Sequence, residues 1–372
     1  MRSSRDSLPP HAQLLATAVA DPQSIRNLTA DDWDLLVRVA GRAELLGTLC
    51  ARLQRAGMLE SVPDAPLRHL KGGLAFYEHR AQMARYLMTG LAHALRDFDG
   101  RVVLLKGAAY VMQGLPFSVG RLFDDVDVLA DRTRLDDVER LLAGHGWESE
   151  KPDAYDQHYY RAWAHELPPM RHARYALQLD VHHTILPVTG RIRPVAARLV
   201  ADAVDLPGTR WCVLSPEDQV LHACAHLFQD SDGVSRIREL VDIDGLVRQH
   251  DGPGFGSRLL ERARLHGLER PLWYAMRYAP RWLDTPVPAG LQPGLDAVAP
   301  SALVRRVMDS MVAAALFPPH PDARPPGIMP LSHRALTARS VWLRMPPWLL
   351  AYHATMKALP ALKGASRSGG AS

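Results

Sequence analysis

Residues 101–130, RVVLLKGAAYVMQGLPFSVGRLFDDVDVLA, contain the change of pattern that decides the fold. An aliphatic run over 102–105 predicts a short β-strand. The following residues, 108–120, predict a short helix and then a loop that contains glycine and proline. Over 124–130 acidic and aliphatic residues alternate, and a period of two predicts a second strand. The stretch therefore predicts two strands separated by a short helix and a loop.

The second of these strands carries acidic residues two positions apart. Side chains at i and i+2 point to the same face of a strand, so Asp125 and Asp127 are expected to project together. Two neighbouring carboxylates repel each other unless a cation neutralises them, and Mg²⁺ accepts such ligands. A third carboxylate is expected from a neighbouring strand, and Asp180 lies in a suitable alternating segment, where it could also act as a general base. The alternative is a solvated edge strand.

The sequence before and after this stretch is mainly helical. Apolar residues recur every three or four positions over 12–98, which predicts several amphipathic helices. Asn27 or Thr29 could cap the first long helix. Residues 133–144 are amphipathic and end in glycine, which predicts another helix.

A second β region and a long helical region are expected downstream. Segments 158–163 and 175–184 are the strand candidates, and Ser215 followed by Pro216 and two acids is a strong helix start. Helices are expected to dominate from there to about residue 279. Pro-rich connectors are predicted at 281–300 and 317–330, and a last, proline-interrupted helix at 340–362.

These elements predict an α+β protein with one small mixed sheet, flanked by N-terminal helices and a C-terminal helical domain. The expected divisions are a helical segment (1–99), an α/β core (100–214), a helical region (215–363) and a flexible tail (364–372).

Composition limits the classes of protein that this chain can be. Its 372 residues are 47% hydrophobic, which excludes a wholly disordered chain, and no apolar run is long enough to span a membrane. A net charge of +4 without an extended basic surface argues against a partner such as a nucleic-acid duplex. Three widely spaced cysteines form neither a zinc motif nor a disulfide framework, so a reducing, cytoplasmic location is expected.

Several motifs together resemble the bacterial uncharacterised nucleotidyltransferase family of the DNA polymerase beta-type superfamily. The core of that family reads Leu-Lys-Gly, a loop, an arginine and then Asp-x-Asp on a strand. The matching residues are Leu105-Lys106-Gly107, Arg121, Asp125-Val126-Asp127, Asp180-Val181-His182, residues 214–218, His222, His226, Arg236-Ile237-Arg238 and Asp242. The superfamily usually has Gly-Ser close before Asp-x-Asp, whereas here 17 residues separate Gly107 from Asp125.

The resemblance implies an Mg²⁺-dependent (or Mn²⁺-dependent) enzyme that moves an NMP from an NTP, by default ATP, to a hydroxyl-type acceptor, with pyrophosphate release. The acceptor could be a small molecule, a peptide or a protein. The expected catalytic and metal-binding residues are Asp125, Asp127 and Asp180. The expected nucleotide-binding residues are Lys106, Gly107 and Arg121, and possible substrate contacts are His182, His222, His226, Arg236 and Arg238.

Alternatives remain open for several of these residues. Lys106 could pair with a nearby acid, and Arg121 could pair with Asp124 or Asp125, instead of binding phosphate. The histidines could be packed core residues, and the spacing of His222 and His226 could also bind zinc. At the level of the whole protein, the alternatives are a regulatory nucleotide-binding module, kinase-like phosphoryl transfer and a non-enzymatic helical scaffold.

Overall fold

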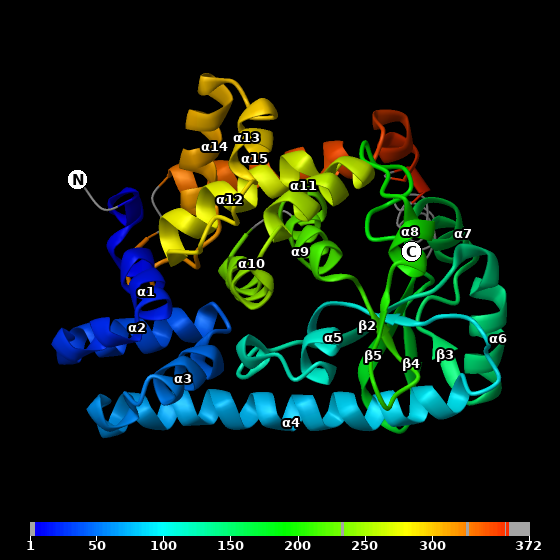
Figure 1. Cartoon of the computed structure of the whole chain (residues 1–372), viewed down its shortest axis with the longest axis horizontal. Helices are drawn as coiled ribbons and strands as arrows, with labels where there is room; N and C mark the ends of the chain where they lie inside the picture. The colour runs from blue at the N-terminus through cyan, green and yellow to red at the C-terminus, as the bar shows by residue number, and fades with distance from the viewer. Residues whose placement is uncertain (1–3, 232–233, 325–326, 354, 357–372) are drawn as a thin grey trace, which may run out of the picture.

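The N-terminal third consists of helices, as the apolar spacing predicts. The computed structural model describes residues 4–231, 234–324, 327–353 and 355–356 (Figure 1). Thr29 caps the second helix through a capping box, in which Thr29 Oγ1 accepts from the Asp32 backbone N–H and the Asp32 carboxylate accepts from the Thr29 N–H. The α-helices are α1 (Pro10–Ala20), α2 (Ala30–Arg42), α3 (Leu46–Arg55) and α4 (Asp64–Ala94).

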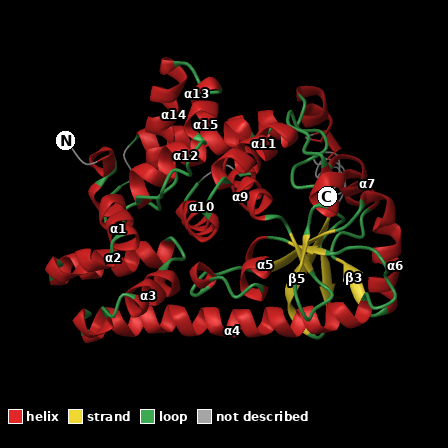
Figure 2. Ribbon diagram, viewed as in Figure 1, coloured by secondary structure: helices red, strands yellow, loops and turns green. Residues whose placement is uncertain are grey.

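Helix α4 connects the two ends of the molecule. It packs against α2 and α3 at one end and against the sheet and α6 (Leu135–Gly144) at the other (Figure 1). The strands lie together near that second end (Figure 2).

In the described part of the chain, seven strands form one mixed sheet in the order β3-β4-β5-β2-β1-β7-β6. Both strands predicted from residues 101–130 are confirmed, as is the strand predicted at 175–184. The strands are β1 (Val103–Leu104), β2 (Asp125–Leu129), β3 (Trp147–Ser149), β4 (Met170–His172), β5 (Tyr175–His182), β6 (Val204–Asp205) and β7 (Cys212–Val213).

The central pair of strands sets the positions of the acidic residues. Strands β2 and β5 run parallel, with Asp127 opposite Asp180 in the register. Val126 and Val128 are buried on the other face of β2, as the period-two pattern predicts.

One strand prediction is wrong. Residues 158–163 belong to a helix, α7 (Ala154–Trp163), although Tyr and Trp favour strands. The Asp153 side chain accepts hydrogen bonds from the backbone N–H groups of Tyr155 and Asp156, and this cap starts the helix. A local capping interaction therefore outweighs the β propensity of the aromatic residues.

The C-terminal half is helical, as expected. Ser215 caps α9 by accepting from the Asp218 N–H. A short π-helical turn (His226–Asp230) follows α9. The α-helices are α8 (Ala196–Ala201), α9 (Pro216–Ala225), α10 (Ile237–His250), α11 (Phe255–His266), α12 (Glu269–Leu283), α13 (Gln292–Ala297), α14 (Ala302–Ala315) and α15 (Ile328–Arg344).

The connector predictions hold only in part. Helix α12 continues through Pro280 to Leu283, and α13 occupies part of the first predicted connector. Helix α15 begins within the second, twelve residues before the predicted start at 340, and ends before Pro346. The predicted tail, 364–372, lies outside the described residues. No helix of the described part is long and apolar enough to cross a membrane.

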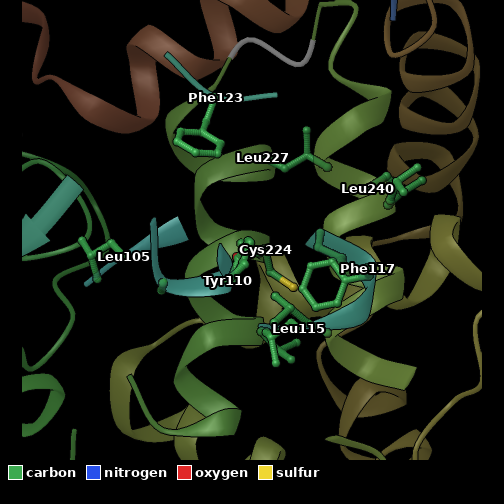
Figure 3. Packing of buried hydrophobic residues seen from close by; sticks show 14 of the residues in the cluster. Leu105, Tyr110, Leu115, Phe117, Phe123, Cys224, Leu227 and Leu240 are labelled. Atoms are coloured by element: carbon green, nitrogen blue, oxygen red, sulfur yellow. The ribbon is translucent and has the colours of Figure 1, made fainter. Parts of the chain in front are cut away.

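The loop between β1 and β2 is held against the helices on both sides. Tyr110 of α5 (Lys106–Met112) and Phe117 lie beside Cys224 of α9 (Figure 3). On the other side, Gly120 has φ +88°, and a Cβ there would lie 2.1 Å from the carbonyl carbon of Gly47 in α3. Only glycine fits this approach, which fixes the loop directly before the acidic strand.

Candidate active site

The three predicted carboxylates come together at the centre of the sheet. Asp125 and Asp127 project from the same face of β2, and Asp180 projects from β5 beside them. One carboxylate oxygen from each lies within 4.8 Å of the other two. This is a set of oxygen ligands suited to a hard divalent cation.

The three carboxyl groups differ in their protonation. Burial alone would raise the pKa of Asp127, but the Lys106 ammonium and the His182 imidazole outweigh burial and hold that pKa far below its usual value. Burial and the charge of Asp127 raise the pKa of Asp125. Burial, Asp127 and Glu166 raise the pKa of Asp180 to about 7. Without a cation, Asp127 is therefore the most acidic of the three.

Asp127 is held by two cationic or hydrogen-bonding neighbours. The Nζ of Lys106 lies 3.4 Å from Asp127 Oδ2, and His182 Nε2 lies 2.9 Å from Asp127 Oδ1. His182 Nε2 also lies 3.4 Å from Glu166 Oε2. His182 is thus a buried partner of Asp127, and Lys106 pairs with an acid.

The turn from β1 into α5 is conformationally strained. Lys106 has φ +43°, a region that residues other than glycine seldom adopt. At Gly107 a Cβ would lie 2.7 Å from the Nη1 of Arg121 and 3.0 Å from the Cβ of Phe123. Glycine at 107 therefore lets Arg121 approach the backbone of the turn.

In the structure the partner of Arg121 is neither Asp124 nor Asp125. Its Nε donates to both carboxylate oxygens of Asp242 at 2.8 Å, and both side chains are buried. Asp124 instead pairs with Arg80 of α4. The alternative considered for Arg121, an ion pair with Asp124 or Asp125, is wrong because α10, packed against the loop, supplies the carboxylate partner.

These residues line a pocket of about 220 Å³ between the sheet and the helices α9 and α10. We call Lys106, Asp125 and Asp127 the sheet wall. We call His226, Arg236, Arg238, Glu239 and Asp242 the helical wall. Gly107, Tyr110, Arg121, Phe123, Asp124 and Ala223 complete the lining.

The structure brings some predicted substrate contacts into the pocket and leaves others outside its lining. His226, Arg236 and Arg238 line it, whereas His182 and His222 are buried side chains outside the lining. Burial, Lys106 and His226 hold the pKa of His222 well below its usual value, so its imidazole is neutral. The groups of three or more potential metal ligands in the described residues include neither His222 nor His226.

The charged side chains of the helical wall already have partners. Arg236 Nη1 lies 2.8 Å from Glu239 Oε1, and His226 Nδ1 lies 3.0 Å from Glu239 Oε2. Arg238 donates to the carbonyl oxygen of Leu122 and pairs with Glu44 at 2.6 Å. Both arginines therefore face the pocket with their positions already defined.

Sequence reasoning missed His165 and Glu166. They follow α7 in an irregular segment, where no periodic pattern marks a buried or functional side chain. Their burial beside His182 comes from pairing with the end of β5, since Glu166 forms a β-bridge with His182. The one available signal was an adjacent His-Glu pair shortly before a predicted strand.

Comparison with known proteins identifies a family. A family model described as an uncharacterised nucleotidyltransferase matches residues 29–284, more than two thirds of the chain. The match runs from the capped start of α2 through the sheet and beyond the end of α12, so it includes both walls of the pocket. No curated protein and no solved structure gives a significant match.

Proposed function

The chain belongs to the uncharacterised nucleotidyltransferase family, and from this premise we propose that it transfers an NMP from an NTP to a hydroxyl group of an acceptor. The observation that carries the proposal is the cluster of Asp125, Asp127 and Asp180, two of which line a pocket that also contains four cationic side chains. Carboxylates for a metal and cations for a triphosphate are the two requirements of this chemistry.

The acidic cluster fits Mg²⁺ or Mn²⁺. The raised pKa values of Asp125 and Asp180 reflect burial and carboxylate repulsion, both of which a hard divalent cation would offset. We propose that all three aspartates hold the metal, which when bound supplies positive charge that stabilises the phosphates in the transition state.

The basic residues of the pocket are the proposed contacts for the triphosphate. Lys106, whose side chain is 22% exposed, can contact a phosphate as a point charge. Arg236 and Arg238 face the same space from the helical wall. Arg121 has one carboxylate partner, Asp242, which fixes the guanidinium in orientation beside the pocket.

Proton transfer is assigned to Asp180. The acceptor oxygen attacks the α-phosphorus, and the bond from that phosphorus to the bridging oxygen breaks, so that pyrophosphate leaves with the electron pair. We propose that the hydroxyl proton passes to the Asp180 carboxylate, whose pKa in the metal-free protein is raised to about 7 by burial and its acidic neighbours and would be lowered by the metal. Asp180 can serve as a base only in its ionised form, which metal binding favours.

The acceptor class stays as broad as a small molecule, a peptide or a protein, and ATP is the first nucleotide to test. A nucleic-acid duplex is not proposed, because the net charge is only +4. A reducing, cytoplasmic setting is proposed because Cys50, Cys212 and Cys224 are all free thiols.

The test is to incubate the protein with each labelled NTP, Mg²⁺ and candidate acceptors, and to measure pyrophosphate and phosphate separately. Pyrophosphate release that needs Mg²⁺ and is lost in Asp125→Asn supports the proposal. The control is Asp131→Asn, an exposed acid just beyond the same strand that caps a short helical turn. Phosphate release would replace the proposal with kinase-like transfer, and NTP binding without turnover would replace it with a regulatory module.

A further inference from the structure

We propose that His165, Glu166 and His182 form a binding site for a transition-metal ion of the Zn²⁺ class, distinct from the aspartate cluster. Each of the three side chains offers one ligand atom, and these atoms lie within 4.8 Å of one another. This inference does not depend on nucleotidyl transfer, because it concerns which ion the protein binds.

The backbone holds these residues in place. The Leu167 N–H donates to the Val181 carbonyl at 2.8 Å, and the His183 N–H donates to the His165 carbonyl at 2.8 Å. These hydrogen bonds join residues 165–167 to the end of β5 in an antiparallel arrangement, with Glu166 bridged to His182. The three side chains are therefore presented by paired backbone, which is the preorganisation that a metal site requires.

Two imidazole nitrogens at this place lack partners. The Nδ1 atoms of His165 and His182 are both buried, and neither has a hydrogen-bond partner. A buried polar atom without a partner is unfavourable, so two such atoms in neighbouring imidazoles indicate a ligand. A bound metal ion would accept the nitrogen lone pairs and remove this cost.

The hydrogen bond on the other side of His182 supports the same assignment. His182 Nε2 lies 2.9 Å from Asp127 Oδ1 and 3.4 Å from Glu166 Oε2, so a proton on Nε2 leaves the Nδ1 lone pair available, and Glu166 would turn its carboxylate from Nε2 to the metal. Metal-ligating histidines commonly donate their second ring N–H to a carboxylate in this way. The metal would thereby fix the imidazole that orients Asp127.

The ligand types select the ion. Two imidazoles and one carboxylate suit Zn²⁺ and its neighbours, whereas Mg²⁺ prefers oxygen ligands. The Glu166 side chain is 20% exposed, which leaves a route for a water molecule as a further ligand.

The test uses the untagged full chain, because a histidine tag would bind metal itself. After treatment with a chelator the protein is loaded with Zn²⁺ for elemental analysis, or with Co²⁺ for its visible absorption spectrum. We expect one equivalent of Zn²⁺ per chain and a Co²⁺ spectrum that shows nitrogen ligands. Affinity should fall at least about tenfold in His165→Ala and in Glu166→Gln, each of which removes a ligand.

Two control variants distinguish this site from surface histidines and from the aspartate cluster. His79→Ala removes an exposed histidine of α4 and should keep the metal. Asp125→Asn alters the aspartate cluster and should keep both the Zn²⁺ and the Co²⁺ spectrum. Circular dichroism checks that each variant is folded, and Glu166→Gln, which preserves side-chain shape, carries the test if His165→Ala unfolds.

Three results would overturn the proposal. The first is a chain that binds no Zn²⁺, and the second is a Co²⁺ spectrum that both ligand variants leave unchanged. The third is loss of the metal in Asp125→Asn, which would place the ion among the aspartates. Any of these would leave His182 as a buried side chain shared by Asp127 and Glu166 without a metal.

Discussion

The sheet wall and the helical wall of the pocket differ in how their charges are balanced. On the helical wall, Arg236 pairs with Glu239, and its neighbour Arg238 pairs with Glu44. On the sheet wall, Asp125 and Asp127 share Lys106, the one cation of that wall, and with Asp180 behind them the carboxylates exceed the cations that face them. The sheet wall and Asp180 thus hold carboxyl groups with raised pKa values that ionise more readily when a cation binds, whereas the helical wall holds arginines already fixed in position.

The difference indicates a division of roles. A wall with excess carboxylate gains stability when a cation binds, and its pKa values respond to that cation. A wall of prepaired arginines loses little side-chain entropy when an anion binds, because its geometry is already set. The contact between Arg121 and Asp242 joins the loop before the acidic strand to the helical wall.

Loss of Asp127, the most acidic of the three carboxyl groups, should have the largest effect. We expect Asp127→Asn to lower kcat at least about 10³-fold, equivalent to about 4 kcal/mol of barrier, because it removes a proposed metal ligand and the partner of Lys106 and His182. Steady-state pyrophosphate release measures the effect, with Asp131→Asn as the control. Retention of activity within about tenfold of the parent would show that the two walls do not differ as described.

Breaking the contact between the walls should cost stability before chemistry. In Asp242→Asn the buried Arg121 guanidinium loses its carboxylate, and removal of one partner of a buried ion pair costs about 3 kcal/mol or more. Urea unfolding measures this cost. The double variant Arg121→Met/Asp242→Leu should recover much of this stability, but its NTP affinity should be lower than that of the parent because Arg121 is missing from the pocket. A double variant no more stable than Asp242→Asn would contradict this prediction.

The two walls also differ in how far the sequence could predict them. Asp125 and Asp127 follow from a local period of two, and Asp180 follows from a second alternating segment. The partner of Arg121 lies 121 residues away and depends on helix packing, which no local pattern records. Glu166 lies in an irregular segment, and α7 was mistaken for a strand because its cap at Asp153 was overlooked. Periodicity therefore predicts strand faces well but not contacts between distant elements.

The carboxyl groups on and behind the sheet wall should make the stability of the protein depend on pH. The folded-state pKa of Asp180 is raised to about 7, above its unfolded value of about 4, so the folded chain binds more protons between these limits. The contribution of Asp180 to the free energy of unfolding of the metal-free protein should therefore fall as pH rises from 4 to 7, by at most about 1.4 kcal/mol per pH unit. The raised pKa values of Asp125 and Glu166 act in the same direction. The lowered pKa values of His165, His183 and His222 act in the opposite direction over part of this range, so the contribution of Asp180 is read as the difference between the parent and Asp180→Asn.

Mg²⁺ and a variant provide the check on this pH effect. Mg²⁺ should raise the melting temperature more at pH 8 than at pH 6, because the carboxylates must be ionised to bind it. In metal-free protein, Asp180→Asn should be more stable than the parent at pH 8. The lowered pKa of Asp127 acts in the opposite direction, but only below about pH 4, where its carboxylate becomes protonated in the unfolded chain. An Mg²⁺ shift independent of pH would contradict the prediction.

On the helical wall, a single substitution should weaken binding more than chemistry. Arg236→Ala removes an exposed guanidinium from the pocket, and we expect KM for the NTP to rise about tenfold, or about 1.4 kcal/mol, with kcat changed less. Arg238→Ala should add a loss of stability, because Arg238 also holds the Leu122 carbonyl. The control is Arg306→Ala, an exposed arginine of α14 away from the pocket. A fall in kcat with unchanged KM would assign Arg236 to the transition state.

The smallest predicted effect concerns the backbone conformation of Lys106, which belongs to the sheet wall. Lys106 starts α5 at φ +43°, which costs an L-residue about 1 kcal/mol and glycine little, whereas Arg236 lies at an ordinary φ of −98°. Lys106→Gly and Lys106→Ala lose the same ammonium, so both should bind NTP more weakly by similar amounts. Urea unfolding should nevertheless find Lys106→Gly more stable by about 1 kcal/mol, the reverse of the usual helix preference for alanine. If alanine were the more stable, the turn would carry no strain, and the sheet wall would hold its cation at no greater conformational cost than the helical wall.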